Sequence, residues 1–201
     1  MKIGVLASGG GTDFQSIVDA VGSGEVNVTI AVLIYNKKNA FVRERAEQAG
    51  IPAVFVDHRK REREDFEREM VAVLDRHDVE LVVLAGFMRL LTPYFISTYW
   101  NRLINIHPAL LPSFPGTHGQ RDAFEYGVKI SGCTVHFVDE NMDSGPIILQ
   151  RAVPVLDDDT EETLKDRILE QEHEILPLVV KLYSEGRLRI EDRKVRILPP
   201  S

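Results

Sequence analysis

The uniformly apolar run Leu81-Val82-Val83-Leu84-Ala85 constrains the fold of this chain more than any other segment. Consecutive apolar residues suit a strand with two buried faces, which is the usual setting of a strand inside a parallel sheet. Further strands are indicated at 2–7, 28–34, 53–56 and 102–107, and helical spacing of apolar residues separates several of these runs. Strands that alternate with helices in this way predict right-handed crossovers and a doubly wound, mostly parallel α/β sheet.

The pattern changes in the second half of the chain. Residues 130–138 and 146–155 alternate in polarity as strands do, and the turn between them predicts a β-hairpin. Asp159 with Glu162 resembles a capping box that opens a long helix to about residue 184. Pro177 is expected to kink that helix. The remaining predicted elements are helices at about 40–49, 60–77 and 119–126, a short helix opened by Thr92-Pro93, and terminal strands at 187–191 and 194–198.

Composition limits the classes of function. The chain has 201 residues, of which 44% are hydrophobic and 27% charged, as expected for one ordinary globular domain. The net charge of −7 disfavours a nucleic acid partner. No apolar run approaches the roughly 20 residues of a membrane span, and the start does not resemble a signal peptide, so we expect a cytoplasmic protein. The single Cys133 excludes an intrachain disulfide and a cysteine-cluster metal site, and its apolar strand predicts a buried, inert thiol.

A glycine-rich loop follows the first strand. Ser8-Gly9-Gly10-Gly11-Thr12-Asp13 precedes a segment with helical spacing, and this arrangement aims backbone N–H groups at a phosphate. The loop lacks the lysine of a Walker motif, and Phe14 stands where a dinucleotide fingerprint requires glycine. The loop therefore fits a single small phosphate better than NAD, although glycine-rich turns after a first strand are also common without a ligand.

A polar pair marks the end of the strand at 102–107. Asn105 and His107 are two residues apart, so their side chains lie on the same side of the strand, and Pro108 ends it. Open α/β sheets bind their ligands at the carboxyl ends of strands. The pair could instead cap the strand and bond to the loop backbone.

Asp143, in the predicted hairpin turn, could fold over the same edge of the sheet. A carboxylate beside an imidazole raises its pKa and fixes its tautomer, and an amide donor such as Asn105 can meet a developing oxyanion. The sequence has no serine or cysteine elbow and no zinc-ligand spacing. The set fits direct acyl transfer onto an amine without a covalent enzyme intermediate, although Asp143 could also be a turn residue facing solvent.

Five segments carry a resemblance to a known family. They are SGGGTDFQ at 8–15, LAGFMRLLTP at 84–93, NIHPALLP at 105–112, TVHFVDENMDSGPII at 134–148 and QEHEILP at 171–177. The chain resembles the phosphoribosylglycinamide formyltransferase family, folate-dependent enzymes of purine synthesis, from Lys2 to about Pro199. The resemblance implies formyl transfer from 10-formyltetrahydrofolate to a ribonucleotide amine, without a metal. It also implies a single domain over 1–201, with a Rossmann-like phosphate-binding half at 1–107 and a folate and active-site half at 108–201.

The resemblance also implies roles for individual residues. His107 would be proton donor or charged stabiliser of the oxyanion, Asn105 its hydrogen-bonding partner, and Asp143 the group that raises the pKa of His107. The positions that match the ribonucleotide site are Gly10, Gly11, Thr12, Asp13, Gln171 and Glu172. The positions that match the folate site are Arg63, Met88, Arg89, Leu90, Leu91, Asn105, Asp139, Glu140, Asn141, Met142 and Asp143. Glu172 could instead be helix surface, and residues 88–91 ordinary core.

Three positions depart from the family's pattern. Asp13 stands where the family usually has asparagine; a carboxylate there suits a helix N-cap but would repel a phosphate. Gln120 stands where another histidine is common, and Ser144 takes the place of a small residue. The first two departures bear on phosphate affinity more than on the reaction type.

Several alternatives stay open. A formyltetrahydrofolate hydrolase would be expected to carry a regulatory domain before the first strand, and a methionyl-tRNA formyltransferase a further domain and a basic surface. A formyltransferase for a different amine, or a non-catalytic nucleotide or folate sensor, is also compatible with parts of the pattern. The complete Asn105, His107 and Asp143 set argues against the sensor. A homodimer is allowed by the sequence but not specified.

Overall fold

The apolar run at 81–85 forms β4 (Leu81–Leu84), and all four of its residues are buried in a computed structural model of the chain. The structure describes residues 1–200 and divides into two units, residues 1–104 and the residues from Asn105 onward. The chain passes from one unit to the next within β5 (Leu103–His107). That the chain is a single domain over 1–201 stays a prediction.

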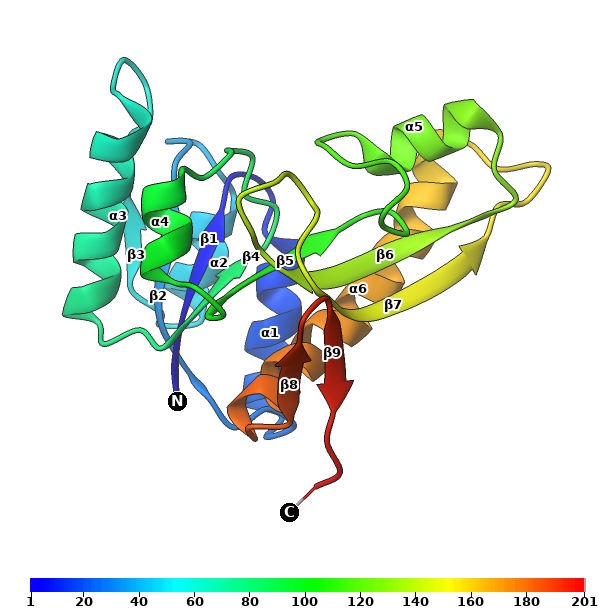
Figure 1. The fold of residues 1–201 in the computed structure, drawn as a ribbon. Helices are drawn as coiled ribbons and strands as arrows, with labels where there is room; N and C mark the ends of the chain where they lie inside the picture. The colour runs from blue at the N-terminus through cyan, green and yellow to red at the C-terminus, as the bar shows by residue number, and fades with distance from the viewer. Residues whose placement is uncertain (201) are drawn as a thin grey trace. The chain divides into compact units, whose positions relative to one another are not determined.

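The first unit is an open parallel sheet with helices. Its strands β1 (Lys2–Ala7), β2 (Thr29–Tyr35), β3 (Ala53–Phe55) and β4 are ordered β3-β2-β1-β4, and the pairings of β1 with β2 and β4 and of β2 with β3 are parallel. The helices are α1 (Thr12–Gly22), α2 (Val42–Gln48), α3 (Arg63–Arg76) and α4 (Pro93–Thr98). Of these, α3 and α4 pack beside each other (Figure 1).

The second unit combines an antiparallel hairpin with a long helix. β6 (Ile130–Phe137) pairs antiparallel with β7 (Ile147–Pro154), and α6 (Glu161–Ser184) packs against both strands (Figure 1). β9 (Lys194–Ile197) joins β7 in parallel and pairs antiparallel with β8 (Leu188–Glu191). A short helix, α5 (Gly119–Tyr126), precedes β6.

These elements confirm the predicted fold class, a mostly parallel α/β sheet followed by a hairpin, a long helix and short terminal strands. The predicted capping box was wrong in its residues. Thr160 is the N-cap of α6 and forms the box with Thr163, while Asp159 accepts from the Thr163 hydroxyl at 2.8 Å and pairs with Arg167. Pro177 lies inside α6, as expected, and its kink stays a prediction. Among residues 1–200, no helix is long and apolar enough to cross a membrane.

Gly132 allows β6 and β7 to approach each other closely. A Cβ at this position would overlap the carbonyl oxygen of Arg151 and lie 3.0 Å from the Cα of Ala152. Both neighbours are backbone atoms of the paired strand, which cannot move aside without breaking the ladder.

We therefore expect Gly132→Ala to lower the free energy of unfolding by at least about 2 kcal/mol, within the range typical of overpacking. Gly22→Ala is the matched control, because a Cβ there meets nothing within 4 Å. Urea unfolding measures both. A Gly132→Ala variant as stable as the control would show that the two strands are not held this tightly.

Candidate active site

The carboxyl end of β5 carries the polar pair identified in the sequence. Asn105 is half-buried, and His107 is only 3% exposed. The apolar residues Leu103, Ile104 and Ile106 on the same strand are buried in the core, which fixes the backbone that carries the pair. The strand therefore presents an amide and an imidazole from a rigid element.

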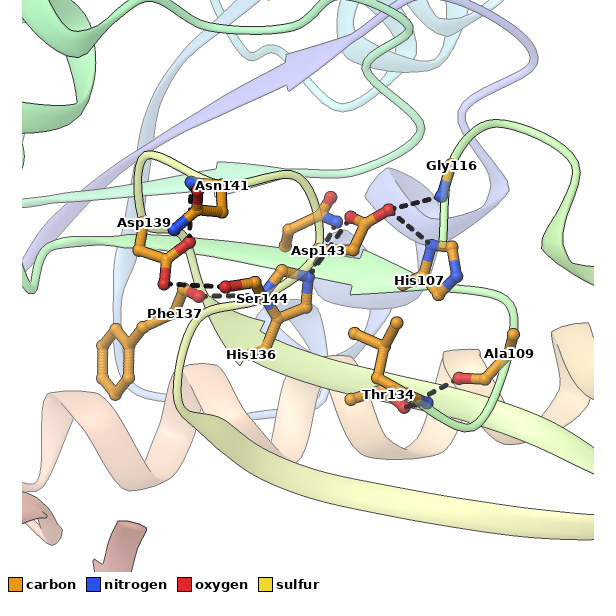
Figure 2. A network of polar contacts seen from close by, with 12 residues as sticks. His107, Ala109, Gly116, Thr134, His136, Phe137, Asp139, Asn141, Asp143 and Ser144 are labelled. Atoms are coloured by element: carbon orange, nitrogen blue, oxygen red, sulfur yellow. Dashed lines mark hydrogen bonds and ion pairs between the residues drawn. The ribbon is translucent and has the colours of Figure 1, made fainter. Parts of the chain in front are cut away.

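His107 has an oxygen acceptor at each ring nitrogen. Its Nε2 lies 2.8 Å from the carbonyl oxygen of Phe114. Its Nδ1 lies 3.6 Å from Oδ2 of Asp143, the contact that Figure 2 shows. A carbonyl oxygen only accepts, so Nε2 carries a proton in this arrangement. An imidazolium at this position could donate from both nitrogens.

Asp143 is held in the turn between β6 and β7 with a left-handed backbone (φ 50°), a conformation that aspartate tolerates better than most residues. Its Oδ2 accepts a hydrogen bond of 2.7 Å from the backbone N–H of Gly116 (Figure 2). The side chain is 14% exposed. The structure therefore brings Asp143 to His107 from 36 residues along the chain, and it faces the site rather than solvent.

The turn that carries Asp143 is braced by its own residues. Asp139 accepts from the backbone N–H of Asn141 at 3.0 Å and from the hydroxyl of Ser144 at 3.1 Å. Arg193, from the β8–β9 turn, donates to the carbonyl oxygen of Ser144 at 2.7 Å. Ser144 thus has a bonding role in the turn that the sequence did not suggest.

Polar side chains of the hairpin hold the loop that follows His107. The hydroxyl of Thr134 donates to the carbonyl oxygen of Ala109 at 2.7 Å and accepts from the backbone N–H of Leu111 at 3.1 Å (Figure 2). Gln150 donates to the carbonyl oxygen of Leu111 at 2.9 Å. These contacts fix the direction in which the chain leaves β5.

Sequence reasoning missed His136. Its Nε2 lies 3.2 Å from Nδ2 of Asn105 and 3.7 Å from Oδ1 of Asp143. Burial is the main cause that lowers the pKa of His136, and it outweighs the opposing attraction of Asp143. Thr134 and His136 are two residues apart on β6, so their side chains lie on the same side of the strand, as those of Asn105 and His107 do on β5. This spacing was the sequence signal that could have identified His136.

In the first unit, the glycine-rich loop leads into α1 as predicted. Gly11 is the N-cap with φ 74°, and a Cβ there would overlap the side chain of Val42. The loop carbonyls are held by α2, since Gly9 accepts from Val42 N at 3.1 Å and Gly10 from Nε of Arg45 at 2.8 Å. The first N–H groups of α1 have no partner within the helix, so this end can receive an anion.

Asp13 is not the N-cap that its residue type suggested. It lies in the first turn of α1, and no side-chain hydrogen bond caps the helix. Burial of the carboxyl raises the pKa of Asp13 to about 6. The charge that would oppose a phosphate is therefore reduced as the pH falls towards 6.

The loop after β4 is tied to the glycine-rich loop. The hydroxyl of Ser8 accepts from Met88 N at 2.8 Å and donates to Oδ1 of Asn36 at 2.7 Å. The side chains of Met88 and Leu90 are 53% and 58% exposed, so they are not core residues. They offer apolar surface to a ligand.

A buried acid supports the end of the same loop. Glu67 on α3 is 1% exposed and accepts from both the backbone N–H of Thr92, at 2.7 Å, and its hydroxyl. Burial raises the pKa of Glu67, against the opposing effect of the Thr92 hydrogen bonds. Thr92 is the N-cap of α4.

The other predicted positions are placed as follows. Arg63 begins α3 and is exposed, as are Arg89, Glu140, Asn141 and Met142, while Leu91 and Asp139 are half-buried. In the second unit, Glu172 on α6 is 6% exposed and so is not helix surface, and its neighbour Gln171 is half-buried. Gln120 is half-buried in the first turn of α5.

Within residues 1–200, no cluster of three or more His, Cys, Asp or Glu side chains could hold a metal.

Comparisons with known proteins identify the family of this chain. A family model described as formyl transferase matches residues 1–180. Phosphoribosylglycinamide formyltransferase from Escherichia coli (strain K12) is 42% identical over 205 residues, covering 100% of this chain and 97% of that protein. The chain belongs to the formyl transferase family. It is therefore an enzyme of the formyltransferase class.

Solved structures of this family have the same fold. Glycinamide ribonucleotide transformylase 1 from Symbiobacterium toebii is 48% identical, with a TM-score of 0.97, and the match covers 99% of this chain and 94% of that one. A formyltetrahydrofolate deformylase from Pseudomonas syringae pv. tomato is 29% identical, with a TM-score of 0.90, and the match covers 98% of this chain and 66% of that one. Formyl transferase relatives of both names therefore share this architecture.

The position of Asp143 gives a test of its charge. Asp143→Asn keeps the size of the side chain and an oxygen acceptor for Gly116, but removes the negative charge beside His107. We expect the rate of formyl transfer to fall by roughly a hundredfold, the scale of a lost general acid or oxyanion stabiliser. Steady-state kinetics measures this loss.

Asp157→Asn is the control, since that carboxylate is 94% exposed and pairs with Lys129 on the surface of the same unit. Its rate should stay within about twofold of wild type. Equal rates for the two variants would show that the charge of Asp143 has no part in the reaction.

Proposed function

We propose that the chain transfers the formyl group of 10-formyltetrahydrofolate to the glycinamide amine of 5-phosphoribosylglycinamide, a step of purine synthesis. The observation that carries the proposal is the approach of Asp143 to His107, at 3.6 Å, beside Asn105 at the end of β5. The full-length matches to phosphoribosylglycinamide formyltransferases support the choice of substrate.

The cluster suits a direct transfer. The substrate amine attacks the formyl carbon, and the carbonyl oxygen gains negative charge as the carbon becomes tetrahedral. The amide of Asn105 is the donor to this oxyanion, an imidazolium at His107 stabilises it by its positive charge, and Asp143 balances that charge. The bond from carbon to the folate nitrogen then breaks, the folate nitrogen takes up a proton, and the amine loses one. His107 is the residue best placed to carry that proton.

The first unit supplies two further sets of residues. The N–H groups at Gly11, Thr12 and Asp13 suit the ribonucleotide phosphate, because the loop carbonyls are turned towards α2. Met88 and Leu90 offer exposed apolar side chains to the folate ring, and Arg63 an exposed cation to the outer carboxylates of the cofactor. In the second unit, the turn at 139–143 and the buried Glu172 are the other proposed binding positions.

Hydrolysis of formyltetrahydrofolate is the second candidate, because the deformylase relative shares the fold over 98% of this chain. In that reaction water would take the place of the amine at the same cluster. The deciding experiment measures tetrahydrofolate release from 10-formyltetrahydrofolate with phosphoribosylglycinamide and with water alone. We expect release to depend on the ribonucleotide and formylated ribonucleotide to accumulate in equal amount. Equal rates with water alone would favour the hydrolase.

Replacement of His107 tests its proposed role. His107→Ala should lower turnover at least about a hundredfold, because general acid catalysis typically supplies that much. Folate binding, measured by fluorescence titration, should change little, since the proposed ring contacts lie elsewhere. A variant with near wild-type turnover would remove His107 from the mechanism.

The carboxylate at position 13 should make phosphate binding depend on pH. Because the pKa of Asp13 is raised to about 6, the group is ionised at pH 8 and mostly neutral at pH 5.5. Asp13→Asn should lower the KM for the ribonucleotide at pH 8 by about fivefold, equivalent to roughly 1 kcal/mol of relieved repulsion. At pH 5.5 the difference from wild type should shrink below about twofold. The same KM ratio at both pH values would mean that the carboxylate does not face the phosphate.

A further inference from the structure

His136 is a buried imidazole whose two ring nitrogens both have partners. Its side chain is 2% exposed. Its Nδ1 lies 2.8 Å from the carbonyl oxygen of Phe137, and its Nε2 lies 3.2 Å from Nδ2 of Asn105. It therefore touches the amide that is proposed to stabilise the oxyanion.

The partners determine which nitrogen carries the proton. The Phe137 carbonyl can only accept, so Nδ1 is protonated. A neutral imidazole has one N–H, which leaves a lone pair on Nε2 to accept from the amide of Asn105. Burial lowers the pKa of His136, which favours this neutral form at neutral pH.

We propose that His136, as the neutral Nδ1–H tautomer, is a positioning residue that fixes the amide orientation of Asn105 for catalysis. One N–H of Asn105 is held by Nε2 of His136, and the second N–H is directed away from it, free to meet the oxyanion. This inference rests on the proposed function, because it assumes that Asn105 acts on the formyl oxygen.

The groups around His136 explain why its charge state matters. Asp143 and Asp139 face it from the hairpin turn, and His107 faces it from β5, while Ile147 is its partner on β7. A proton on Nε2 would set an N–H against the N–H of Asn105. It would also aim a donor at Oδ1 of Asp143, 3.7 Å away, in competition with His107. The amide would then turn, and the carboxylate would be shared between two cations.

Two variants separate orientation from simple packing. His136→Gln keeps an acceptor near the position of Nε2, whereas His136→Leu has similar bulk and no acceptor. We expect His136→Leu to lower kcat at least about thirtyfold, with the KM of both substrates within about threefold of wild type. His136→Gln should keep kcat within about fivefold of wild type. Thermal unfolding of both variants identifies any loss of fold.

The pH profile provides a second readout. In the wild type, kcat should fall on the acid side as His136 gains its second proton, because the neutral form is the active one. In His136→Gln this step is absent, so the acid limb should lie at lower pH. An unchanged acid limb, equal losses in the two variants, or a change in KM alone would overturn the proposal.

The tautomer can also be observed directly. Long-range ¹⁵N–¹H correlation spectra of the wild-type protein at pH 7.5, assigned with His136→Gln, should show one histidine with a protonated Nδ1 and an unprotonated Nε2. A signal for His136 with protonated Nε2, or with both nitrogens protonated, would overturn the inference whether or not the enzyme formylates phosphoribosylglycinamide. Absence of ribonucleotide formylation in the wild type would instead refute the proposed function.

Discussion

The arrangement of this site depends on the contacts that the carboxylate of Asp143 makes. It accepts a hydrogen bond from Gly116 N and lies within 4 Å of two imidazoles, Nδ1 of His107 and Nε2 of His136. Each ring places its other nitrogen on a backbone carbonyl oxygen, that of Phe114 for His107 and that of Phe137 for His136. The rings differ because Nε2 of His136 also meets the amide of Asn105. Burial lowers the pKa of His136. One anion can thus stabilise a charge on His107 while its neighbour stays neutral and accepts.

The second unit uses its antiparallel hairpin to support this chemistry. β6 contributes Thr134, which holds the loop after His107, and His136, which holds Asn105. The turn beyond β6 contributes Asp143, and its shape is braced by Asp139, Ser144 and Arg193. The catalytic candidates therefore come from strands and a braced turn rather than from mobile loops, which suits a reaction that depends on orientation.

Local sequence signals predicted much of the fold because they reflect local physics. The apolar run of β4, the glycine loop before α1 and the alternating strands of the hairpin all matched the structure to within a few residues. The sequence-based predictions of helix N-caps were wrong where several neighbouring residues could each have been the cap. Thr160 rather than Asp159 caps α6, and Gly11 rather than Asp13 caps α1, because the backbone conformation at each end selects one residue among several capable ones.

The sequence by itself determined the fold class and the placing of Asn105 and His107 on one face of a strand, since both follow from spacing along the chain. It also indicated the family, through the resemblance of five segments to known enzymes. Only the tertiary structure decided that Asp143 reaches His107, that Glu67 is buried against Thr92, and that His136 rather than a backbone group bonds the amide of Asn105. These contacts join residues 25 to 36 positions apart. Such contacts depend on strand pairing and turn geometry, which no local pattern of residues specifies.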